Sequence, residues 1–422
     1  HYFKTLKEKE MNNNKRWLYL AVATVILLFQ GLIYAWSLFR TPFSEIYTDW
    51  TVAQLSMTFT ISISCFCLGG FVGGQLSKKL GVKVRFLITA VCLFIGFFGV
   101  SMLNPADSAG SLTKLYIFYG VFGGGGVGIG YNAVISTITK WFPDKVGLAS
   151  GIMLMGFGLG SLLLGSVVTG MVAAQGLFPT FKILAIAITV VMVVGAIIIK
   201  APAAPAAPAE AKAEEKEEKS TAVSFSAGEM LKTSRFWIFF LWAIALNSAG
   251  LMVINSAANI SLAFGGSAIL GMVVSLFNGA GRIIAGNNFD RFGRKKSTLI
   301  NVCFMMIAGI LLVLAGKTNS LLLITVGLVF VGMAYGGTPT ITSAYTNLSF
   351  GPKNFTANFS IANFSLLPAA IVGPMISAKL LEAAGGKYDT CFIAIIVFTL
   401  ISLVLWVLLN GASKKSVNED YK

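Results

Sequence analysis

The sequence predicts an all-α polytopic membrane protein with twelve transmembrane helices arranged as two six-helix bundles. Of the 422 residues, 56% are hydrophobic and only 12% are charged, and the mean hydropathy is +0.79. That is too few charges to coat soluble domains of this total size. Twelve apolar runs are each long enough to cross a hydrocarbon layer of about 30 Å, which takes about 20 helical residues. A segment rich in proline, alanine and charge divides the runs into two sets of six.

The apolar runs give the order of the elements. We expect spans at residues 17–39, 52–76, 84–103, 113–138, 148–172 and 178–199, and then at 236–261, 266–288, 297–316, 319–344, 355–381 and 389–410. The predicted domains are an N-terminal tail (1–16), a first bundle (17–199), a linker (200–235), a second bundle (236–410) and a C-terminal tail (411–422). The proline and charge runs at 201–208 and 210–219 cannot bury apolar surface, so we expect a flexible tether there.

The distribution of positive charge predicts the orientation. The tails, the linker and the loops on the same side hold 25 lysine and arginine residues, and the opposite loops hold six. Because positively charged loops stay in the cytoplasm, both termini and the linker are predicted to be cytoplasmic. The protein is expected to lie in the cell (plasma) membrane. The net charge of +15 therefore belongs to membrane-flanking loops, and no nucleic-acid partner is expected. The six opposite charges are Arg40, Lys114, Lys182, Lys317, Lys379 and Lys387.

A glycine and charge motif occurs twice, after the second span of each half. Residues 286–295 read GNNFDRFGRK and residues 74–83 read GQLSKKLGVK, at an offset of 212. The pattern G-x-x-x-D-[RK]-x-G-[RK]-[RK] resembles the loop signature of the major facilitator superfamily. We expect a conformational latch in which Asp290 caps a neighbouring helix N-terminus or pairs with a cation. Lys78 replaces the acidic residue in the first half, which leaves a latch there in doubt. The motif residues are Gly74, Lys78, Gly81, Gly286, Asp290, Arg291, Gly293 and Arg294.

Arg282 is the one ionisable residue that the predicted spans place deep in the membrane. An arginine near the midplane costs at least about 2.5 kcal/mol and almost always faces a cavity or a partner. No carboxylate of the protein is placed beside it, so we expect its partner to be a substrate carboxylate, which the guanidinium fork fits. A structural arginine bound only to main-chain carbonyls is the alternative. Asn278, one turn earlier, could bind or orient the same carboxylate. Tyr34, Tyr131 and Tyr335 could reach a central cavity, or could serve packing alone.

Other chemistries find no support in the sequence. The five cysteines lie in apolar runs without metal-ligand spacing, so neither a disulfide nor a metal site is expected. The glycine-rich run 123–130 lies inside an apolar span, so we interpret it as a site of close helix packing rather than a dinucleotide loop. No nucleophile and base pair is present, so the protein is not predicted to be an enzyme and needs no cofactor.

Longer segments are similar to the oxalate:formate antiporter family, itself similar to the monocarboxylate transporters. The resemblance runs from Arg16 onward and rests on residues 16–17, 34–38, 141–151, 228–232, 236–237 and 278–282. It implies that Arg282 binds the substrate carboxylate and that the three tyrosines line the same cavity. An oxalate carrier of this family is expected to have a lysine in span 11, but residues 358–368 contain none. Asn363 and Leu366 of that segment are candidate substrate contacts.

These observations predict a secondary active transporter of small monocarboxylate anions such as pyruvate, lactate or formate. One fixed positive charge neutralises one carboxylate, and a dianion would leave a desolvated negative charge. We expect anion exchange by alternating access in a functional monomer. Proton symport, dicarboxylate antiport of the oxalate:formate type and transport of a neutral solute remain alternatives. A sensor or scaffold is a further class, for which no signalling domain is recognised.

Overall fold

The computed structural model describes residues 2–202, 224–254, 256–271 and 273–413, and these residues form helices and no strand. Eleven helical segments of the described chain are long and apolar enough to cross a membrane. The predicted count of twelve differs by one because the eighth and ninth spans are joined in a single 46-residue helix, α13 (Val273–Thr318). Gly293 interrupts it with φ 71° and ψ −179°, a conformation that glycine adopts without steric cost. The two predicted spans are therefore separate on either side of this kink.

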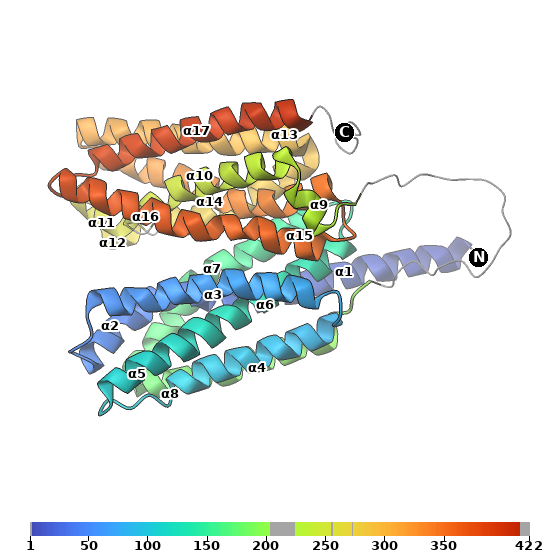
Figure 1. Ribbon diagram of the computed structural model, residues 1–422, viewed down its shortest axis with the longest axis horizontal. Coiled ribbons are helices and arrows are strands. Elements are labelled where there is room, and N and C mark those ends of the chain that lie inside the picture. Colours follow the sequence, from blue (N-terminus) through green and yellow to red (C-terminus); the bar gives the residue numbers. More distant parts are fainter. Residues whose placement is uncertain (1, 203–223, 255, 272, 414–422) are drawn as a thin grey trace.

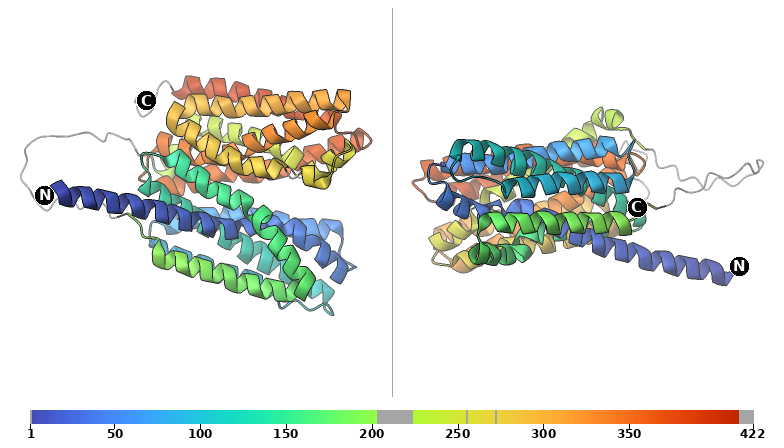
Figure 2. Two further views of the ribbon diagram at one scale, coloured as in Figure 1. Left: turned by 180° about the vertical axis from the view of Figure 1, so that it is seen from behind. Right: turned by 90° about the horizontal axis from the view of Figure 1, so that it is seen from below.

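The first half contains eight α-helices and three shorter 3₁₀ or π segments. Its elements are α1 (Tyr2–Gln30), η1 (Gly31–Ala35), α2 (Trp36–Ile46), α3 (Val52–Leu76), α4 (Val82–Val100), α5 (Ser108–Leu115), η2 (Tyr116–Gly123), α6 (Gly124–Ile138), η3 (Thr139–Trp141), α7 (Val146–Gln175) and α8 (Leu177–Ile198). Residues 2–16, predicted as a tail, continue the first helix, and Figure 2 shows this part of α1 projecting from the bundle.

The second half repeats the helical pattern with more interruptions. Its elements are α9 (Ala227–Leu231), α10 (Ser234–Ile254), α11 (Ala257–Ala263), α12 (Ala268–Gly271), α13, α14 (Leu321–Phe350), α15 (Phe355–Ala362), η4 (Asn363–Ser365), α16 (Leu366–Ala383) and α17 (Asp389–Ser413). The first residues of α1 and the last of α17 lie at the same end of the molecule (Figure 1). We call this the terminal end.

The C-terminal part of the predicted linker, after the expected tether, is packed against the second half. Residues 203–223 lie outside the described chain. The amide of Phe225 donates to the carbonyl of Phe350 at 2.9 Å, and the side chains of Asn354 and Asn358 each donate to the carbonyl of Phe225 at 3.0 Å. The Arg235 guanidinium lies 4.7 Å and 4.9 Å from the ring centres of Phe225 and Phe350. The linker is thus tied to α14 and α15 before α10 begins.

Each half has its own hydrophobic core. One core draws on residues 19–199 together with Phe355 and Phe359 of α15, and the other on residues 230–409. Figure 1 shows the halves side by side, with α1–α8 in one and α10–α17 in the other. Because α15 contributes to the first core, it belongs to the contact between the halves.

The glycine-rich run of the fourth predicted span lets α6 approach α3 closely. A methyl group added to Gly124 or Gly128 would overlap the main-chain oxygen of Ser62 or Phe66 of α3. Such overlap leaves no room for a side chain, and small residues are what permit this spacing between helices in a membrane. The packing interpretation of this run is confirmed, and no phosphate-binding loop forms from it.

Candidate substrate site

A cavity lies between the two halves. Its first-half wall is aromatic and comes from α3, α6 and α7. Its second-half wall carries the polar groups and comes from α10, α13, α14, η4 and α16. The lining residues are Phe66, Tyr131, Phe157, Asn247, Arg282, Tyr335, Pro339, Thr342, Asn363, Ser365 and Leu366. Of these, Arg282 alone is charged.

Arg282 reaches the cavity from α13 and is held on two sides. Its side chain is 5% exposed. Its Nε donates to Oδ1 of Asn278 at 3.2 Å, and its Nη1 donates to the main-chain carbonyl of Leu154 on α7. Asn278 therefore orients the arginine and is not among the lining residues. The bond to Leu154 crosses between the halves, so the guanidinium touches both walls of the cavity.

The flat face of this guanidinium rests on Gly158 of α7. A methyl group added there would lie 2.8 Å from Cζ and 2.9 Å from Nη2 of Arg282. Since these distances are shorter than van der Waals contact, any side chain at position 158 has to displace the guanidinium.

We expect Gly158→Ala to weaken substrate binding by about tenfold or more, because a displacement of about 1 Å at such a site is costly. The measurement is the concentration dependence of uptake into proteoliposomes. Gly170→Ala is the matched control on the same helix, since a methyl group at Gly170 would meet no atom within 4 Å. An equal effect of both substitutions would show that helix packing, and not the arginine, is responsible.

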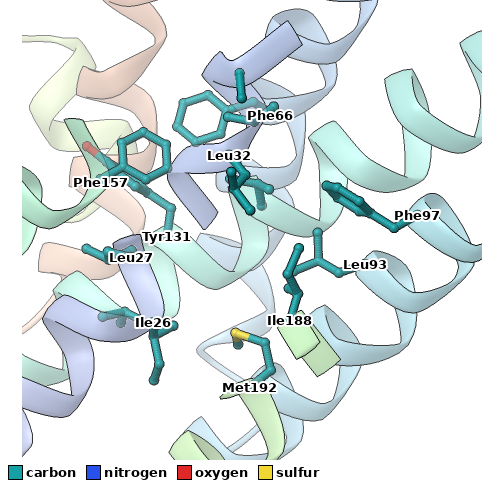
Figure 3. Packing of buried hydrophobic residues seen from close by; sticks show 14 of the residues in the cluster. Ile26, Leu27, Leu32, Phe66, Leu93, Phe97, Tyr131, Phe157, Ile188 and Met192 are labelled. Carbon is teal, nitrogen blue, oxygen red and sulfur yellow. The ribbon is translucent and has the colours of Figure 1, made fainter. Parts of the chain in front are cut away.

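The aromatic wall consists of three rings in mutual contact. The rings of Phe66 and Tyr131 are 5.2 Å apart, those of Tyr131 and Phe157 are 5.0 Å apart, and those of Phe66 and Phe157 are 5.9 Å apart. Figure 3 shows these three side chains together in the packed interior of the first half. Edge and offset contacts of this kind fix the rings in place. The three rings therefore present an apolar surface to the cavity.

The other predicted site residues are placed as follows. Tyr335 of α14 lines the cavity with its ring against Gly250 of α10. Asn363 and Leu366 line it from the short 3₁₀ turn η4 and the start of α16. The side chain of Tyr34 lies outside the described residues, although its main chain belongs to η1.

The interruption of span 11 lies at this turn. Pro368 and Pro374 of this segment remove main-chain donors, and the chain departs from α-helix at Asn363–Ser365. Pro374 lies within α16. A proline cannot donate to the preceding turn, so its effect appears several residues earlier in the chain.

Asp290 caps the N-terminus of α7 from the opposite half. Its two carboxylate oxygens accept hydrogen bonds from the amides of Gly147 at 2.8 Å and Leu148 at 2.7 Å. Lys145, which precedes α7, makes no side-chain cap of its own. Gly286 and Gly147 are close enough that a methyl group on either would overlap the carbonyl of the other. The motif thus lies at the contact of α13 with α7, near the terminal end.

The first-half copy of the motif makes a different contact. A methyl group on Gly74 of α3 would lie 2.5 Å from Oγ of Ser360 on α15, so the helices also approach closely here. Lys78, at the position of Asp290, is exposed, and the space around Gly81 is open. Asn132 of α6 donates to a main-chain carbonyl of α15 at 3.1 Å. This side is therefore joined by packing and by a neutral hydrogen bond.

The remaining motif residues lie in the turn after Asp290. Arg291 is exposed, Gly293 forms the kink of α13, and Arg294 is buried with its Nη1 donating to Oδ1 of Asn410 at 3.0 Å. Arg294 therefore fixes the turn to α17 within its own half.

Sequence reasoning missed several residues of the cavity. Phe66 and Phe157 lie in long apolar runs, where no pattern separates a cavity wall from ordinary core. Asn247 had a usable signal, because it is an amide near the middle of the seventh apolar run. Outside the cavity, Arg85 lies at the edge of the predicted span 84–103, and it is buried on α4 with its Nε and Nη1 lacking a hydrogen-bond partner in the described structure.

These features define a class: a multi-pass helical membrane transporter with a central cavity between two related halves. Residues 18–367 match the Major Facilitator Superfamily, and the chain belongs to that family. Its members are transporters and not enzymes, in agreement with the sequence prediction.

The relatives divide into full-length and partial matches. The chain is 25% identical to the oxalate:formate antiporter of Oxalobacter formigenes over 398 residues, which cover 92% of this chain and 90% of that protein. It is 31% identical to monocarboxylate transporter 12 of Rattus norvegicus over 130 residues, or 31% of this chain and 24% of the relative.

Solved structures share the fold at low sequence identity. The proton:xylose symporter XylE aligns with a TM-score of 0.71 and 16% identity, covering 97% of this chain and 98% of XylE. The E. coli fucose:proton symporter FucP aligns with a TM-score of 0.64 and 13% identity, covering 94% and 99%. The predicted fold of two six-helix bundles is thereby confirmed.

Proposed function

We propose that the protein is a secondary active transporter of small monocarboxylate anions and that Arg282 binds the substrate carboxylate. The observation that carries the proposal is the cavity itself, in which Arg282 is the one charged side chain among the lining residues. A buried guanidinium with no carboxylate beside it favours an anionic ligand. Tyr131 and Tyr335 line the same cavity and offer hydroxyl groups to that anion.

The number of charges favours a monocarboxylate over a dicarboxylate. The relative from Oxalobacter formigenes is named for oxalate and formate exchange, but the described span-11 segment of this chain adds no second cation to the cavity. Besides Arg282, the lining of the cavity contains the apolar side chains of Phe66, Phe157 and Leu366. A substrate with one carboxylate and a short apolar group matches both parts of this lining, whereas a dianion would carry an unpaired charge in a low-dielectric site.

Transport is proposed to proceed by alternating access of the cavity to the two sides of the membrane. With both termini in the cytoplasm, the contacts of Asp290 and Gly286 with α7 and of Gly74 with α15 close the cytoplasmic side. Opening requires these contacts to break while others form on the opposite side. The motif is thus proposed to act as a latch whose contact is strong at Asp290 and weak at Lys78. The protein itself is proposed to work in the cell membrane.

Coupling is proposed to be anion exchange, because an empty cavity leaves the Arg282 charge without a partner when the halves close. In proteoliposomes we expect labelled pyruvate or lactate uptake to rise at least about tenfold when unlabelled substrate is present inside. Oxalate should neither enter nor compete at similar concentrations. Uptake into empty vesicles driven by an imposed pH gradient would identify proton symport instead, and rapid oxalate exchange would contradict the single-cation argument.

A further inference from the structure

The cavity contains a buried amide that the proposed carboxylate site does not use. Asn247 of α10 is 4% exposed and lines the cavity. Its Oδ1 has no hydrogen-bond partner, and its side chain makes no hydrogen bond with any other residue that the structure describes. Burying an amide without partners costs about 1–3 kcal/mol in proteins. Such a cost is recovered when a ligand supplies the missing bonds.

Other buried asparagines of the described chain have structural partners. Asn301 donates to the carbonyl of Ala334 at 2.9 Å and to Oγ1 of Thr338 at 3.1 Å. Asn132 and Asn358 likewise donate through Nδ2 to main-chain carbonyls, although their Oδ1 atoms also lack a partner, whereas Asn247 makes no such donor bond to any described residue. Asn247 is therefore not explained by helix packing, and its place in the cavity wall gives it access to a substrate.

The packing around Asn247 holds it near the centre of the site. Gly250, one turn later on α10, lies against the ring of Tyr335, and a methyl group there would be 2.7 Å from the ring. The main chain of the adjacent residue Ser248 lies against Gly373 of α16. The α10 backbone is thus fixed between α14 and α16. The amide is consequently a preorganised group on a second helix, separate from Arg282 on α13.

Two anchors on different helices impose a requirement on the substrate. A guanidinium fork occupies both oxygens of one carboxylate. The amide then needs a third oxygen on the same small molecule, and the nearest carbon that can carry one is C2. An amide both donates and accepts, so it can bind a keto oxygen through Nδ2 or a hydroxyl through Oδ1.

We propose that Asn247 makes the transporter selective for 2-oxo and 2-hydroxy monocarboxylates over unsubstituted ones, which rests on the proposed function of Arg282. The carboxylate lies at Arg282, the C2 oxygen at Asn247, and the carbon tail at Phe66, Phe157 and Leu366. Formate and acetate fill only the first of these positions. Propionate has the length of pyruvate but lacks the C2 oxygen, so it isolates the contribution of Asn247.

The test compares half-inhibitory concentrations of pyruvate, L-lactate and propionate against labelled-substrate exchange in proteoliposomes. In the wild type we expect pyruvate and lactate to compete at least about tenfold better than propionate, because a site built to hydrogen-bond an oxygen rejects the analogue that lacks it. In Asn247→Ala and in the more space-filling Asn247→Leu, we expect this ratio to fall to within about twofold of one, while propionate binds as before.

The matched control is Ser248→Ala. It removes a fully buried, unpartnered hydroxyl from the neighbouring residue of α10, outside the cavity lining, and should leave the ratio unchanged.

A wild type without preference for the C2 oxygen would overturn the inference. So would Asn247 variants that weaken all three acids equally, since this is the result of a purely structural role. If propionate exchange still requires Arg282 in that case, the proposed function stands without the inference. If no monocarboxylate competes, the proposed function itself fails.

Discussion

Replacing Arg282 with glutamine is expected to lower monocarboxylate exchange by about 100-fold or more, because it removes the one charge that lines the cavity. Truncating one member of a buried charge pair costs about 2–5 kcal/mol, and each 1.4 kcal/mol is a factor of ten. We expect Arg282→Lys to lower monocarboxylate exchange nearly as much. Lysine keeps the charge but cannot hold the bonds to Asn278 and Leu154 and still present two parallel donors to a carboxylate.

The measurement is labelled-pyruvate exchange in proteoliposomes, with direct binding followed by the change in thermal stability on adding substrate. Lys317→Gln is the control for loss of a cation, since Lys317 is exposed near the end of the same helix. Full activity of Arg282→Gln in a correctly folded protein would point to a neutral substrate and refute the anion site. Activity of Arg282→Lys at wild-type level would show that charge alone suffices.

Replacing Asp290 with asparagine is expected to shift the carrier toward its cytoplasm-open state by about tenfold. The carboxylate accepts two hydrogen bonds at the start of α7, and asparagine can accept only through its single amide oxygen and without charge. Loss of a helix cap costs about 0.5–2 kcal/mol, and the helix dipole adds to this. This cost falls only on the state in which α13 and α7 are in contact.

Distances between spin labels at Lys83 and Lys296 report this shift, because both residues are exposed, lie at or next to the ends of the two motif copies and belong to different halves. We expect a longer distance to gain population in Asp290→Asn in a cysteine-free background. Lys78→Gln occupies the corresponding motif position of the first half and should leave the distribution unchanged. An equal shift in both variants would remove the special role of Asp290.

The fold was predictable because hydropathy measures how apolar a segment is, and a segment must be apolar over about 20 residues to cross the membrane. Predicted spans such as 52–76 coincide with the helix α3, and others differ by a few residues at their ends. The errors have physical causes. Hydropathy records where apolar side chains end, whereas helix hydrogen bonding continues through polar residues, as in α1 before Arg16 and in α14 up to Phe350. The kink at Gly293 falls in the polar gap between the predicted spans 266–288 and 297–316, but its positive φ is a backbone property that hydropathy does not record.

The candidate site was predictable where a residue type is unusual in its surroundings. An arginine in an apolar run is such a residue, and so is a carboxylate between the two glycines of a repeated motif. Phe66 and Phe157 could not be assigned, because a phenylalanine in a span is ordinary and only tertiary packing decides what it faces. The contact of Gly158 with Arg282 also joins distant segments of the chain. One sequence alone carries no record of that pairing.

A cavity with a single arginine also determines how the proposed carrier responds to membrane voltage. Loaded with a monoanion, the cavity is neutral, and moving it across the field does no electrical work. Empty, it carries one positive charge, whose movement through 100 mV is worth about 2.3 kcal/mol. One-for-one exchange of monoanions would therefore be electrically silent. The two concentration ratios alone would set its direction, and a cell could run it without drawing on its membrane potential.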